Sequence, residues 1–86
     1  MHMHQTLVEY KELKKRFPDE YNELTHAFRV MLFRIIEYLN NGQPVTKLYE
    51  LPPGSEERIK IHQQLETLRP RGFDYLASSF EQIYYL

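Results

Sequence analysis

The stretch PDEYNELTHAFRVMLFRIIEYLNNG, residues 18–42, holds the longest helical pattern in the sequence. Pro18 suits the first turn of a helix, and the two acidic residues after it complement the positive end of the helix dipole. The stretch ends in Asn-Asn-Gly, and these residue types tolerate the left-handed backbone that often terminates a helix. Together these signals predict one helix over about residues 18–40, roughly 34 Å long.

Apolar side chains recur along this stretch at helical spacing, so one side of the predicted helix should face a core. The set consists of Tyr21, Leu24, Phe28, Met31, Leu32, Ile35, Ile36 and Leu39. Phe28 and Ile35 lie in the middle of this face, and we expect both side chains to anchor the core.

Proline and glycine separate three further amphipathic segments from the central one. The first covers about residues 6–17, and its Thr6 and Glu9 have the spacing of a capping box, in which each side chain bonds a backbone N–H at the helix start. The second begins after Ser55, a favoured N-cap residue, and runs to about residue 69. The third runs from about residue 73 to near the C-terminus, so four helices are expected in all.

The composition fits one small helical domain covering residues 1–86. The absence of cysteine excludes disulfides and favours a reducing, cytoplasmic setting. The longest apolar stretch, residues 27–39, is too short to span a bilayer and contains charged residues, so we expect no membrane insertion. The predicted fold class is all-α, a compact bundle of four helices around the long central helix at about residues 18–40.

The sequence contains no motif that would support catalysis. It lacks a phosphate-binding glycine loop, a nucleophile elbow and a zinc-protease signature. Glu23 and His26 have the spacing found in di-iron bundles, but such a site needs a second copy of the motif and two further inward carboxylates. We therefore read them as a surface pair, and we predict a protein that is not an enzyme and has no catalytic, cofactor-binding or metal-ligating residues.

The charge is nearly balanced, with 11 basic and 12 acidic residues and a formal net charge of -1. This balance differs from the strongly basic footprint of a typical nucleic-acid-binding domain, so nucleic acid is not the expected partner. One alternative stays open. The chain would then be a small nucleic-acid-binding regulator that uses its first helix and the corner formed by Arg69 and Arg71.

The back of the predicted central helix carries a second apolar strip, opposite the side that faces the core. His26, Val30, Phe33 and Glu37 line up along this strip, and Val30 with Phe33 forms its apolar patch. Arg29 and Arg34 flank the strip. Exposed apolar patches with a charged rim are common at partner surfaces. We therefore predict a partner interface made of four of these residues: Arg29, Val30, Phe33 and Arg34.

Two arrangements would keep this strip out of water, and the sequence leaves both open. Either the first helix or residues 45–51 cover it within the chain, or a second chain covers it. Tyrosine, phenylalanine, methionine and arginine are enriched at interfaces, and aromatic residues make up 14% of this chain. The leading hypothesis is a small non-enzymatic interaction module, a cytoplasmic regulator or adaptor that acts as a homodimer or on a larger protein partner.

Overall fold

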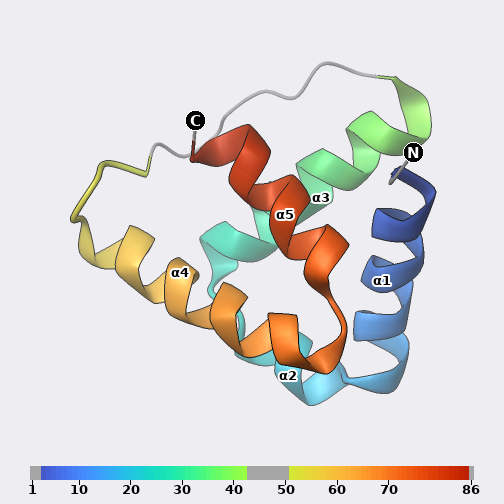
Figure 1. The fold of residues 1–86 in the computed structure, drawn as a ribbon, viewed down its shortest axis with the longest axis horizontal. Coiled ribbons are helices and arrows are strands. Elements are labelled where there is room, and N and C mark those ends of the chain that lie inside the picture. Colours follow the sequence, from blue (N-terminus) through green and yellow to red (C-terminus); the bar gives the residue numbers. More distant parts are fainter. Residues whose placement is uncertain (1–2, 43–50, 86) are drawn as a thin grey trace.

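Five α-helices make up the part of the chain that the computed structural model describes, residues 3–42 and 51–85 (Figure 1). In chain order the elements are α1 (Met3–Arg16), α2 (Pro18–Glu23), α3 (His26–Asn41), α4 (Glu56–Leu68), the single-turn 3₁₀ helix η1 (Arg69–Arg71) and α5 (Asp74–Tyr84). These described residues contain no strand. The predicted all-α class is therefore confirmed.

The prediction of one long central helix at about residues 18–40 is wrong, because Leu24 and Thr25 interrupt the helix and divide it into α2 and α3. Both residues have extended backbone, with ψ angles of 147° and 155°. The side chain of Thr25 then caps α3 by accepting a hydrogen bond from the N–H of Phe28 at 3.1 Å. The predicted four helices thus become five, and Thr25 is a cap where a helix interior was expected.

A side chain from α4 holds this break in place. The Gln64 amide donates to the carbonyl of Glu23 at 3.0 Å and accepts from the N–H of Thr25 at 3.4 Å. Backbone groups at a helix end need such partners because they have none within the helix. The break is therefore built from one local cap and one long-range contact.

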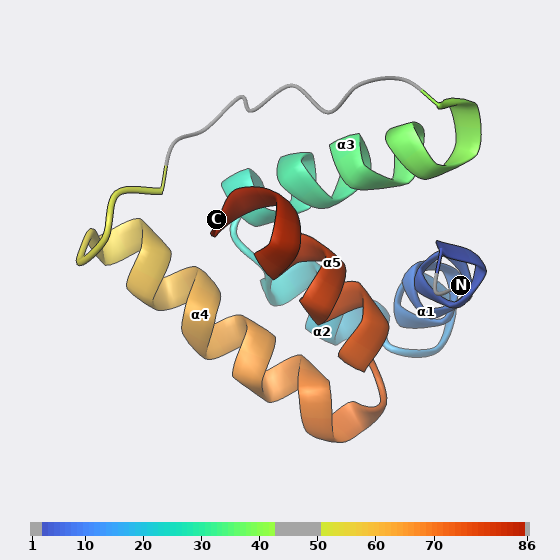
Figure 2. The same ribbon diagram turned by 45° about the horizontal axis from the view of Figure 1, so that its top comes forward.

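The middle of the bundle is occupied by α5 and not by the helix that was predicted there. Figures 1 and 2 show α5 lying between α1, α3 and α4, and it packs against all three. Its Phe80 is fully buried, with its ring centroid 4.7 Å from that of Phe28 in α3. One turn later the Tyr84 hydroxyl donates to the carbonyl of Met31 at 3.3 Å. Helix α5 is thus the element against which α1, α3 and α4 pack.

The core-facing side predicted for residues 21–39 is confirmed. Six of its members are buried: Leu24, Phe28, Met31, Leu32, Ile35 and Ile36. The other two, Tyr21 and Leu39, are partly buried and pack against the core. Of the predicted covering segment, residues 45–51, only Leu51 belongs to the described part of the chain, and its side chain is buried in the core.

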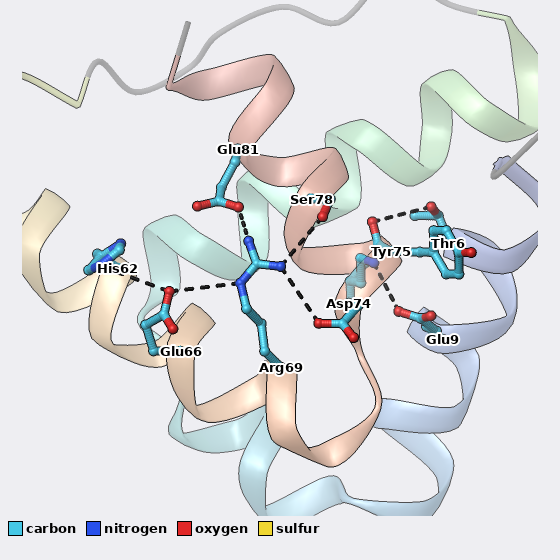
Figure 3. A network of polar contacts seen from close by, with 10 residues as sticks. Thr6, Glu9, His62, Glu66, Arg69, Asp74, Tyr75, Ser78 and Glu81 are labelled. Atoms are coloured by element: carbon cyan, nitrogen blue, oxygen red, sulfur yellow. Dashed lines mark hydrogen bonds and ion pairs between the residues drawn. The ribbon is translucent and has the colours of Figure 1, made fainter.

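The capping box predicted for Thr6 and Glu9 is also wrong. Helix α1 begins at Met3, so both residues lie inside it, and their side chains bond α5 instead. The Glu9 side chain is buried, with 4% of the residue exposed, and its Oε1 accepts the N–H of Leu76 at 2.9 Å. The Thr6 hydroxyl lies 3.0 Å from the hydroxyl of Ser79 and 3.5 Å from the carbonyl oxygen of Tyr75, the contact drawn in Figure 3.

This carboxylate acts as a cap supplied by another helix. Phe73, at the N-cap position of α5, offers no side-chain hydrogen bond, and Leu76 is in the first turn. The N–H groups of a first helical turn carry partial positive charge and need acceptors. Glu9 therefore meets this need and at the same time ties the first helix to the last.

Replacing Glu9 with alanine should lower the free energy of unfolding by about 1–3 kcal/mol, because the buried N–H of Leu76 would lose its acceptor. Glu9→Gln keeps an oxygen at this position and should lose less. The matched control is Glu12→Ala in the same helix, which removes only an exposed ion pair with Arg16 and should cost under about 0.5 kcal/mol. Urea denaturation measures all three. Equal losses for Glu9→Ala and Glu12→Ala would contradict the capping role.

Phe28→Ala should cost about 3–5 kcal/mol, because it removes a fully buried ring that packs against Phe80. Ile59→Ala is the control, since Ile59 is 50% exposed and its loss should stay within about 0.5 kcal/mol. Denaturant melts compare the two variants. A loss below about 1 kcal/mol for Phe28→Ala would mean that the core is packed differently.

Candidate functional site

The four residues of the predicted interface lie together on the side of α3 that faces away from the core. We call this side, with His26, Val30, Phe33 and Glu37 flanked by Arg29 and Arg34, the outer face of α3. Phe33 is 54% exposed, while Arg29, Val30 and Arg34 are partly buried. A large aromatic ring at the centre of a helix is therefore more than half in solvent.

The ends of α3 are well defined, which gives its outer face a fixed backbone. Thr25 caps the start, and Gly42 ends the helix with a left-handed φ of 69°. The N–H of Gly42 bonds the carbonyl of Tyr38 at 2.8 Å, as in a common helix stop. Since the opposite side of α3 is packed into the core, the outward direction of Phe33 follows from the fold.

The two arginines on this face differ in their partners. Arg34 lies 3.9 Å from the carboxylate of Glu37 in a partly exposed pair, which contributes little to stability. Among the described residues no carboxylate pairs with Arg29, and its buried Nε has no hydrogen-bond partner. An unsatisfied buried donor costs about 1–3 kcal/mol. Arg29 is therefore a polar group on this face for which the described residues supply no hydrogen-bond partner at Nε.

The nearest aromatic neighbour of Arg29 does not supply a negative charge. Its guanidinium lies 6.0 Å from the ring of Tyr21, and the ammonium of Lys14 lies 5.9 Å from the same ring. Burial raises the pKa of Tyr21, as does its hydrogen bond with Tyr10, while the two cations oppose this rise. The phenol thus stays neutral at physiological pH, and among the described residues no carboxylate compensates the charge of Arg29.

The arginine corner considered for nucleic acid is occupied by ion pairs. Figure 3 shows the Arg69 guanidinium at the centre of a network, and its partners are Glu66, Asp74, Ser78 and Glu81. Arg71 pairs with Glu20 of α2 at 2.9 Å. Both arginines therefore link helices, and carboxylates already surround their charges.

The structure separates the two residues that have the spacing of a di-iron motif. Glu23 is the last residue of α2 and His26 is the first of α3, with the break between them. Over residues 3–42 and 51–85, no group of three or more His, Cys, Asp or Glu side chains is arranged to hold a metal ion.

A hollow between α4 and α5 was not predicted from the sequence. Its volume is about 400 Å³, and Arg58, the exposed Ile59 and Tyr85 are among its lining residues. The Tyr85 hydroxyl is buried and has no hydrogen-bond partner among the described residues. Burial raises the pKa of Tyr85, although Arg58, 4.4 Å from its ring, opposes the rise. No local sequence pattern links Ile59 with Tyr85, which lie 26 positions apart, so only the fold brings them together.

Within the described ranges, no helix combines the length and the apolar character needed to cross a membrane. Comparison of the chain with protein-family models, with curated proteins and with solved structures gave no match. Its function must therefore be argued from its own residues, and the outer face of α3 offers the most specific arrangement.

Proposed function

We propose that this protein is a non-enzymatic interaction module, a cytoplasmic regulator or adaptor, and that it binds a protein partner through the outer face of α3. The observation that carries this proposal is the exposure of Phe33 at the centre of a well-ordered helix. Aromatic and arginine side chains dominate the binding energy of many interfaces. Phe33 with Val30, Arg29 and Arg34 at its sides has this composition.

The hollow between α4 and α5 is a weaker candidate for the binding surface. Its exposed apolar residue, Ile59, is aliphatic, and its arginine already donates to the carbonyl of Leu51 at 3.0 Å. On the outer face of α3, in contrast, the described residues supply no hydrogen-bond partner for the Nε of Arg29, beside the exposed ring. A partner would gain both apolar contact and a polar bond there.

A nucleic-acid-binding role through α1 and the arginine corner is the second candidate. Its support is the exposed group of lysines at the end of α1, Lys11, Lys14 and Lys15. Binding to phosphates requires cations that can replace the counterions of nucleic acid. Arg69 and Arg71 are paired with carboxylates, so the second candidate has less support than the first.

Phe33→Glu should leave the protein folded and abolish binding of its partner. The ring is more than half exposed, so the variant should keep its helical circular dichroism and lose less than about 1 kcal/mol of stability. A glutamate in place of the ring would remove its apolar contact and would lose hydration when buried at the interface, which explains the loss of binding. An unfolded variant would mean that the ring is covered within the chain.

Site-specific photocrosslinking in the native host tests the binding itself. A photoreactive phenylalanine analogue in place of Phe33 should give one discrete adduct, either with a different protein or with a second copy of the chain. The same analogue in place of Ile59, an equally exposed residue of α4, is the matched control. Absence of an adduct at position 33, or identical adducts from both positions, would refute the proposal.

A further inference from the structure

We propose that the partner of the outer face of α3 is a second copy of this chain, bound antiparallel across a two-fold axis that passes beside Phe33. This inference rests on the proposed function, because it names the occupant of the same surface. In such a dimer the same patch meets itself, so every contact occurs twice.

The charges of the outer face are placed symmetrically and with opposite sign. Arg29 lies four residues before Phe33, and Glu37 lies four residues after it. Residues four apart lie on one side of a helix, so the three residues follow one line along α3, with Phe33 exposed and the two charged residues partly buried beside it. Four residues correspond to about 6 Å along the axis, which is the same distance on either side of Phe33.

An antiparallel two-fold crossing converts this symmetry into complementarity. A residue four positions before the axis then lies level with the residue four positions after it in the other chain. Arg29 thus meets Glu37 of the partner subunit, and Glu37 meets Arg29 of the partner subunit. A parallel arrangement would place like charges opposite each other, which disfavours it.

The single chain leaves both members of this pair poorly satisfied. Arg29 has no carboxylate among the described residues, and its Nε lacks a hydrogen-bond acceptor. Over the described residues, the one ion pair of Glu37 is its contact with Arg34 at 3.9 Å. The carboxylate of Glu37 from the partner subunit would therefore compensate the charge on the partly buried guanidinium of Arg29.

The apolar part of the face is compatible with the same axis. Phe33 would lie against Phe33 of the partner subunit, which removes both exposed rings from water. Val30, partly buried in the single chain, lies beside it and widens the apolar contact. A central aromatic pair with flanking ion pairs matches the usual anatomy of interfaces, with an apolar core and a polar rim.

Charge exchange on the purified full chain tests the pairing. Wild type should sediment as a dimer in analytical ultracentrifugation at micromolar to millimolar concentration. Arg29→Glu or Glu37→Arg alone puts like charges at both contacts and should weaken dimerisation by about tenfold or more. The double variant restores opposite charges and should recover the wild-type constant to within about threefold. Glu57→Arg, a charge reversal on the exposed surface of α4, is the control and should change nothing.

Each outcome decides between the two proposals. A monomeric wild type with a Phe33-dependent crosslink to a different protein would overturn self-association and leave the interaction module standing. A dimer that survives Phe33→Glu would overturn self-association through the outer face of α3, because association would then use another surface, and the crosslink at position 33 tests the proposed function separately. Single variants that dissociate without recovery in the double variant would overturn the antiparallel register. Circular dichroism of every variant ensures that a loss of dimer is not a loss of fold.

Discussion

The buried hydrogen bond between the carboxylate of Glu9 and the N–H of Leu76 is the constraint on which the arrangement of this bundle depends. A carboxylate is buried at low free-energy cost only where hydrogen-bond donors and positive charge compensate it. The N–H groups of the first turn of α5 provide both. The bond therefore positions α5 against α1. From there α5 also contacts α3 and α4, so its placement determines how the apolar faces of three helices meet.

Much of the fold follows from local patterns, because helical spacing and cap residues act over a few positions. The core face of residues 21–39 and the cap at Ser55 were predictable for this reason. The break at Leu24 was not, since Leu24 continues the apolar spacing and the break is stabilised by Gln64, far along the chain. The role of Glu9 was predicted wrongly for a similar reason, because a glutamate can cap its own helix in a capping box or cap another helix, and the sequence pattern is the same.

The candidate site shows the same division between local and tertiary information. Its four predicted residues lie together because they share one side of a single helix. Whether a described carboxylate lies beside Arg29 depends on which helices surround it, and the paired state of Arg69 and Arg71 depends on the packing of α5 and α2. Sequence spacing therefore locates a surface, whereas its electrostatic state requires the fold.

The position of α5 in the chain has a consequence for biosynthesis. A ribosome releases α1, α3 and α4 before α5, yet these helices bury much of their apolar surface against α5. The contact between Glu9 and Leu76 closes a long loop of the chain. The conformational entropy of that loop must be lost before the contact can stabilise the fold. The nascent chain thus exposes the apolar faces of these helices until α5 has emerged, and exposed apolar surface of this kind favours aggregation.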